Sequence, residues 1–83
     1  MKDARRIEFW SVENTGWSGG ISWFSTGGSE TNPLRFKSED EAMEYAITCK
    51  NELDQDSTKW RVVKTCITST EWDEMIYREY NFL

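Results

Sequence analysis

Two adjacent glycines are the residues of this chain that could bind a phosphate group, and they lie in the segment WFSTGGSETNPLRF. A glycine-rich turn cradles phosphate when a lysine and a serine or threonine follow it directly at the start of a helix. Here Gly27 and Gly28 are followed by SETNPLRFKS, and the first helix signal comes only at Ser38. The spacing therefore favours a turn between two strands over a phosphate site.

Nucleophilic and acid–base catalysis lack the residues that usually perform them. The chain contains no histidine, so a serine or cysteine nucleophile would need a lysine, a carboxylate or the N-terminus as its base. Lys64 stands two residues before Cys66, but we expect Cys66 to be buried. The carboxylates of SEDEAMEY should lie on an exposed helix face, without an apolar pocket to raise a carboxyl pKa. We therefore expect no enzymatic activity.

The cysteine usage bears on metals and on the compartment. Cys49 and Cys66, without histidine, are too few ligands for an ordinary structural zinc site, so we expect no metal and no cofactor. Small secreted domains usually carry more cysteines, and no apolar run resembles a signal peptide or a membrane span. We expect a soluble, cytoplasmic protein with no membrane partner. Two reduced thiols are the favoured state, and a Cys49–Cys66 disulfide is the alternative.

The aromatic content is high, with five tryptophans, four phenylalanines and three tyrosines in 83 residues. One helix covers only one face of a sheet, so several rings should stay exposed, and we expect these among Trp17, Trp72 and either Trp10 or Trp60. Exposed tryptophans are typical of protein-binding hot spots. Alternatively, the C-terminal segment folds over the second face and buries them.

The net charge of −5 is concentrated in residues 38–56, which hold seven acids against the single base Lys50. Such a run is either a solvated helix face or an acidic patch that docks on a basic partner. The candidate partner-binding residues are Glu39, Asp40, Glu44, Asp54, Asp56, Trp17 and Trp72.

The elements that would position these residues follow from local patterns. Strands are predicted over residues 5–14, 21–26, 34–37 and 59–68, the last in a central position because both of its faces are partly apolar. Ser38 and Glu41 form a capping-box pair before a helix that runs to residue 53. Ala42, Ala46, Cys49 and Leu53 make one apolar stripe on that helix.

These elements predict one α+β domain over residues 1–83. It should contain a small antiparallel β-sheet, in β-β-β-α-β order, with one helix packed across one face. A short C-terminal helix or strand would follow. Trp72, Met75, Ile76 and Tyr80 fit a helical face with Thr70 as N-cap, and an edge strand fits the same tail.

The segment WFSTGGSETNPLRFKSEDEAMEYA resembles the central motif of a small respiratory complex I accessory-subunit family, the ETC complex I subunit domain. The resemblance covers residues 7–65 and implies a strand–strand–helix–strand fold and a non-catalytic docking role. Gly28 stands where the family usually has an acid, and the tail after Thr65 has no counterpart. The matching positions are Ile7, Glu8, Phe9, Trp23, Ser25, Thr26, Gly27, Asn32, Phe36, Ser38, Ala42 and Tyr45.

We therefore predict a non-catalytic protein-binding module that modulates or stabilises a larger assembly. The alternative is a small acidic inhibitor of the phage or anti-CRISPR kind, which would block the basic site of a nucleic-acid-binding protein. A third hypothesis is a sheet face that binds single-stranded nucleic acid, since Arg35, Lys37, Lys59, Arg61 and Lys64 lie among aromatics on predicted strands.

Overall fold

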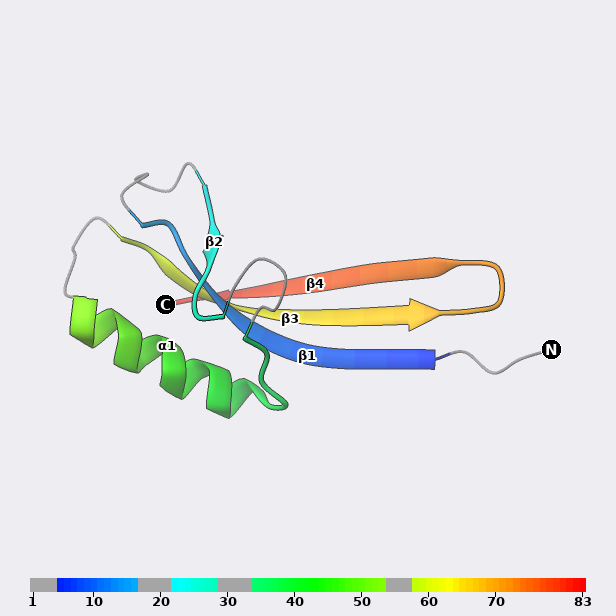
Figure 1. The fold of residues 1–83 in the computed structure, drawn as a ribbon, viewed down its shortest axis with the longest axis horizontal. Helices are drawn as coiled ribbons and strands as arrows, with labels where there is room; N and C mark the ends of the chain where they lie inside the picture. The colour runs from blue at the N-terminus through cyan, green and yellow to red at the C-terminus, as the bar shows by residue number, and fades with distance from the viewer. Residues whose placement is uncertain (1–4, 17–21, 29–33, 54–57) are drawn as a thin grey trace.

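The computed structural model describes residues 5–16, 22–28, 34–53 and 58–83. The elements in chain order are β1 (Arg5–Asn14), β2 (Phe24–Ser25), α1 (Glu39–Leu53), β3 (Trp60–Ser69) and β4 (Glu74–Phe82) (Figure 1). The sheet has the order β2-β1-β3-β4 with antiparallel neighbours. An antiparallel sheet with one helix is an α+β architecture, as predicted.

Three long strands form most of the sheet. β1 pairs with β3 from Arg5↔Ser69 to Asn14↔Trp60, and β3 pairs with β4 from Arg61↔Phe82 to Ser69↔Glu74, both without interruption. β3 is central, as its two partly apolar faces predicted.

In the part of the chain that the structure describes, no helix is long and apolar enough to cross a membrane.

The strand predicted at residues 34–37 is not formed. Phe36 makes an isolated antiparallel bridge with Trp10, in which each backbone N–H donates to the other residue's carbonyl, at 2.7 and 2.9 Å. Ser38 caps the helix two residues later, so the chain turns away from the sheet before a strand can extend. Within the described part of the chain, two strands therefore precede α1. The second is also shorter than predicted, with Phe24–Ser25 in the sheet.

The helix begins as the capping box predicted, because the backbone N–H of Glu41 donates to Ser38 Oγ at 3.3 Å. Ala42 and Ala46 are fully buried and Cys49 packs at the edge of the core. Leu53 does not continue this stripe: half of its surface is exposed, because the core does not reach the last turn of α1.

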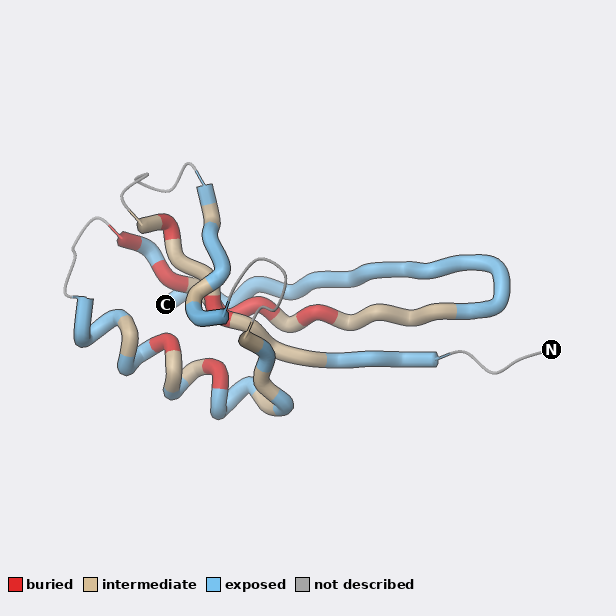
Figure 2. Tube along the Cα trace, in the orientation of Figure 1, coloured by how far each residue is buried: buried red, intermediate tan, exposed pale blue. Residues whose placement is uncertain are grey.

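The core is small and lies at one end of the molecule, between α1 and the sheet (Figure 2). Trp60 is only 2% exposed and provides most of the bulk that the two alanines leave to the sheet. Trp60 is therefore not one of the exposed tryptophans, and Trp10 is half-buried beside it. The core cluster is Val12, Ala42, Ala46, Trp60 and Val62.

The C-terminal tail is a strand, which settles the choice between helix and strand. Thr70 does not cap a helix: its hydroxyl accepts the backbone N–H of Trp72 and of Asp73, at 3.3 and 2.9 Å, and so closes the β3–β4 turn. β4 extends the edge of the sheet instead of covering its second face. The sheet face opposite α1, called here the open face, therefore has no second layer among the described elements.

Candidate partner-binding surface

The predicted acidic residues on α1 are exposed but do not form one patch. Asp40 and Glu44 are one turn apart on the solvent side of the helix. Glu39 is turned toward the sheet, where its carboxylate accepts a hydrogen bond from the Asn81 amide at 2.9 Å. Trp17, Asp54 and Asp56 lie outside the described residues.

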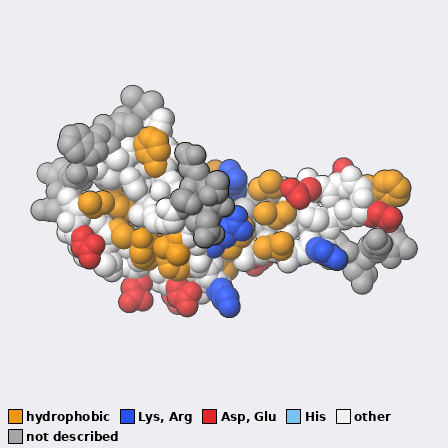
Figure 3. Space-filling view, in the orientation of Figure 1, with side chains coloured by type: hydrophobic (Ala, Val, Ile, Leu, Met, Phe, Trp, Pro, Cys, Tyr) orange, Lys and Arg blue, Asp and Glu red, His pale blue; other side chains and the backbone are white. Residues whose placement is uncertain are grey.

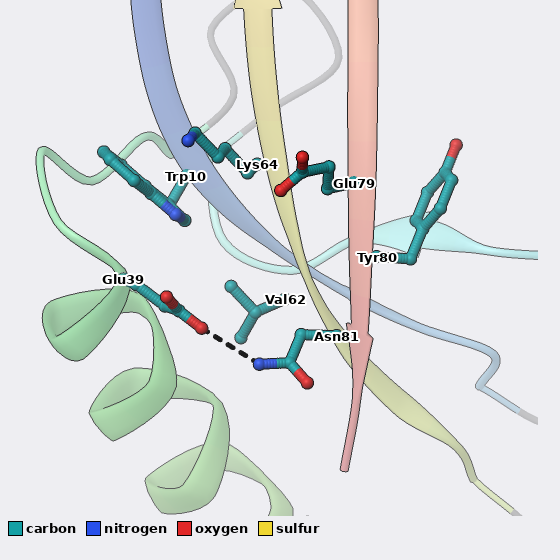
Figure 4. Close-up of a pocket in the computed structure, with 7 residues that line it drawn as sticks. All are labelled: Trp10, Glu39, Val62, Lys64, Glu79, Tyr80 and Asn81. Atoms are coloured by element: carbon teal, nitrogen blue, oxygen red, sulfur yellow. Dashed lines mark hydrogen bonds between the residues drawn. The ribbon is translucent and has the colours of Figure 1, made fainter.

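A cavity of about 210 Å³ lies where α1 meets β4, and Figure 4 shows the Glu39–Asn81 hydrogen bond crossing it. The Lys64 ammonium lies 5.6 Å from the centroid of the Trp10 ring. Tyr80 is turned away from the other side chains in this view. The cavity brings two carboxylates and one amine to the wall of the core. Its lining residues are Trp10, Glu39, Val62, Lys64, Glu79, Tyr80 and Asn81.

Cys66 and Lys64 are not arranged as a nucleophile and its base. The Cys66 thiol faces the Glu8 carboxylate, with 3.9 Å between sulfur and oxygen, while Lys64 reaches toward Trp10. Both cysteines are free and half-buried. Within the described residues, no group of three or more His, Cys, Asp and Glu side chains could hold a metal ion.

The glycine pair forms a turn packed against α1. Gly27 has a φ of +79°, and a Cβ there would lie 2.8 Å from the Tyr45 hydroxyl and 2.9 Å from a methyl of Leu34. The side chains of Tyr45 and Leu34 thus occupy the space beside Gly27. The Tyr45 hydroxyl is also close to Cys49, and a hydrogen bond to that thiol, with partial burial, raises the pKa of Tyr45.

The open face is covered near the core by arginine side chains stacked on rings. The Arg61 guanidinium carbon lies 4.0 Å from the centroid of the Trp23 ring and 4.2 Å from that of Tyr80. Its position is fixed by an ion pair with Glu13, at 2.5 Å, in which both side chains are mostly buried. Phe82 packs edge-on against Trp23, with 5.8 Å between ring centroids.

A second arginine covers the next ring along this face. The Arg35 guanidinium carbon lies 4.2 Å from the centroid of the Phe9 ring. Beside it lies a shallow cavity of about 180 Å³, bordered by Arg35 and Arg78, with the hydroxyls of Ser11 and Thr65 in its wall. Arginine side chains that stack on aromatic rings thus cover this part of the open face.

Beyond the helix the sheet continues as a bare extension, called here the arm: residues 5–8, 66–69 and 74–77 with the turn at 70–73 (Figures 1 and 2). The pairing Ile7↔Ile67↔Ile76 lines up three isoleucines across its open face, the isoleucine row. Ile7 and Ile76 are each 55% exposed. In Figure 3 a band of hydrophobic side chains crosses the arm between charged groups.

The rest of the arm also exposes apolar side chains. Trp72, in the turn at the tip, is 85% exposed, as the sequence predicted for this residue. Met75 and Tyr77 are mostly exposed on the face opposite the isoleucine row. The whole molecule is 51 Å long, and Trp72 and α1 lie at opposite ends (Figure 1). A single small surface therefore does not contain both Trp72 and the acidic residues Asp40 and Glu44.

Two parts of this surface were missed by the sequence reasoning. The predicted strands at residues 5–14 and 59–68 contained Ile7 and Ile67, two of the three members of the isoleucine row. Ile76 was the missing member, since its face depended on whether the tail was a helix or a strand. The stacking of Arg61 on Trp23 had no sequence signal, because it joins distant segments.

Comparison of the chain with family models, with curated proteins and with solved structures finds no match. The resemblance to the complex I accessory-subunit family accordingly stays a prediction.

Proposed function

We propose that this chain is a non-catalytic protein-binding module that docks on a larger assembly through its arm. The observation that carries the proposal is the isoleucine row together with Trp72: apolar side chains gathered on a part of the sheet that has no core of its own. Single exposed apolar residues are ordinary, but contiguous ones on a protruding element are typical of binding sites.

The arm is suited to docking because its backbone is preorganised by the strand pairing with β3. Burial of apolar surface contributes about 25 cal/mol per Å², and a rigid ribbon loses little conformational entropy on binding. Trp72 and Tyr77 supply the large rings that dominate hot spots. A stabilising role in a larger complex, as the complex I resemblance implies, would use the same element.

In this proposal the acidic face of α1 has a secondary role. Asp40 and Glu44 lie in solvent, where charge raises the rate of encounter with a basic partner more than it holds the complex. If α1 were instead the main contact, the chain would be an acidic inhibitor of a nucleic-acid-binding protein, and the partner would be lost when these two acids are reversed.

Direct binding of single-stranded nucleic acid is less well supported. Base stacking needs free ring faces, whereas Arg61 lies over Trp23 and Tyr80, and Arg35 over Phe9. A nucleic acid would have to displace an ion-paired arginine before a base could stack.

We also propose a reducing, cytoplasmic setting, which the two free thiols support.

The proposal is tested by affinity purification from the native cell. The wild type, an arm variant and a matched control are compared first, and Asp40→Lys/Glu44→Lys and Arg61→Glu are added to test the two alternatives. Ile7→Thr combined with Trp72→Ala removes apolar surface from two elements of the arm and keeps β propensity at the strand position. Ile47→Thr is the matched control, because Ile47 is similarly exposed but lies on α1. Thermal unfolding confirms that all three fold.

We expect a partner protein to co-purify with the wild type and with Ile47→Thr but not with the arm variant. Equal co-purification with the wild type, Ile47→Thr and the arm variant would contradict docking through the arm. Loss of the partner with Asp40→Lys/Glu44→Lys alone would favour the acidic inhibitor. Retention of single-stranded DNA or RNA that is abolished by Arg61→Glu would favour the nucleic-acid hypothesis.

A further inference from the structure

The outer edge of β4 is a long, regular and open strand edge. All nine residues are exposed, the pairing with β3 steps through them without a bulge, and the strand has no proline. Among the described residues no strand pairs with this edge, and Figure 1 shows no element beside it along the arm. Natural sheets usually shorten, bulge or cover such edges, because an open edge recruits another strand.

The hydrogen-bonding groups of that edge can be assigned from one contact. The backbone N–H of Leu83 donates to the carbonyl of Trp60 at 3.0 Å. Because the backbone groups of an antiparallel strand point alternately to either side, odd-numbered residues of β4 bond to β3. The N–H and C=O groups of Glu74, Ile76 and Arg78 therefore point outward.

We propose that a second copy of this chain pairs with this edge, antiparallel β4 to β4, with Ile76 opposite Ile76 of the second copy at the two-fold axis. The charges of the strand select this register. Centring on Ile76 places Glu74 opposite Arg78 on both sides of the axis, and opposite charges stabilise a cross-strand pair. The outward N–H and C=O groups of these residues then meet in hydrogen-bonded pairs.

The neighbouring registers lack this complementarity. Centring on Arg78 opposes two arginines, and centring on Glu79 opposes two glutamates. Centring on Tyr77 sets Arg78 against Ile76 and Glu79 against Met75, and centring on Tyr80 sets Arg78 against Phe82. Edge charges normally prevent pairing, but in the Ile76 register the two Glu74–Arg78 pairs, next to the axis, attract one another. Asp73 and Glu79 of the second copy also face each other in this register, at the ends of the paired segment.

The two copies do not obstruct one another in this arrangement. Asn81, level with the start of α1, is five residues from Ile76. At roughly 3.4 Å per residue, each helix-bearing end lies about 17 Å from the axis, on opposite sides. The acidic helices are then separated by several Debye lengths, each about 8 Å at physiological salt, so their repulsion is screened.

The pairing also gives the isoleucine row a continuation. Ile7, Ile67 and Ile76 of one copy meet Ile76, Ile67 and Ile7 of the other, so a single apolar band crosses an extended sheet. The proposal stands whether or not that band docks a further protein, because it depends only on the β4 edge.

Sedimentation velocity of the full chain, from micromolar to millimolar concentration, tests the register with a charge swap. We expect a wild-type dimer and, for Glu74→Arg or Arg78→Glu alone, a dissociation constant raised about tenfold or more by like charges across the axis. The double variant Glu74→Arg/Arg78→Glu should recover most of the wild-type affinity. Glu52→Arg, which makes the same charge change at an exposed position near the end of α1, is the control and should dimerise normally.

A wild type that is monomeric over this range overturns the proposal, and so does a double variant as weak as the single ones. Hydrogen exchange gives a second readout that does not need a variant. The amides of Glu74, Ile76 and Arg78 should exchange more slowly as the protein concentration rises, while those of Glu71 and Asp73 should not change. Concentration-independent exchange at Ile76 would also overturn the proposal.

Discussion

The guanidinium carbon of Arg61 lies 4.0 Å from the centroid of the Trp23 ring, on the open face of the sheet. The same group contacts Tyr80 and pairs with Glu13, so one residue of the central strand joins β1, β4 and the segment before β2. Among the described residues, stacked side chains thereby cover the open face near the core in place of a second layer of structure. Among the described residues, the arm has no such cover.

Arg61→Lys should destabilise the fold although it keeps the charge. Lysine lacks the planar group that stacks on Trp23 and Tyr80 while pairing with Glu13, so we expect a loss of about 1–2 kcal/mol in the free energy of unfolding. Chemical denaturation measures it. Arg5→Lys, on the same sheet face but in the exposed arm, is the control, and equal effects of the two substitutions would contradict a stabilising role for the stack.

Ala46→Leu should overpack the interface between α1 and the sheet. Ala46 has no exposed surface and lies in the core with Val62 and Trp60, so the larger side chain should cost about 1–3 kcal/mol. Ile47→Leu, at the next and exposed position, changes an aliphatic side chain outside the core. Thermal unfolding compares the two, and an Ala46→Leu protein as stable as Ile47→Leu would mean that α1 is not packed as described.

Gly27→Ala should be more damaging than Gly16→Ala. Both glycines have positive φ, but the new Cβ at Gly27 would meet Tyr45 and Leu34 below 3.0 Å, whereas the nearest atom at Gly16 is 3.8 Å away. Backbone strain costs about 1–2 kcal/mol at either position, and the collision adds to it only at Gly27. Urea denaturation measures the free energy of unfolding of both variants. A larger loss of stability for Gly16→Ala than for Gly27→Ala would contradict this prediction.

The parts of the fold that depend on neighbouring residues could be predicted from the sequence. Ser38 and Glu41 marked the start of the helix, and Ala42 and Ala46 identified its buried side. The alternation in residues 5–14 gave the bounds of β1 as observed. These signals are local, since caps and periodicity act within one or two turns or along a single strand.

The parts that depend on distant pairing could not be predicted. The tail fits a helical period and a strand period equally, and the pairing of β4 with β3 decides between them. The isoleucine row arises from two strand registers, and the register is a property of pairs of strands. Phe36 formed a bridge rather than a strand because Ser38 starts the helix two residues later, and propensity alone does not express that competition.

The candidate site shows the same division. Exposure of Trp72 followed from the number of rings that one helix can cover. The distance of Trp72 from Asp40 and Glu44 could not be predicted in this way, because the length of the β3–β4 hairpin determines how far the arm extends from α1. The acidic residues and Trp72 were expected on one surface. The structure places Asp40 and Glu44 at the opposite end of the molecule from Trp72.

Binding kinetics with the protein captured by the wild type tests docking through the arm most directly. A desolvated hot-spot residue mainly slows dissociation, and its truncation costs about 2 kcal/mol or more, so Trp72→Ala and Ile7→Thr should each speed dissociation tenfold or more. Asp40→Lys/Glu44→Lys should slow association and weaken its salt dependence, with little change in dissociation. Wild-type dissociation rates for both arm variants, with binding lost on reversal of the two acids, would contradict the account.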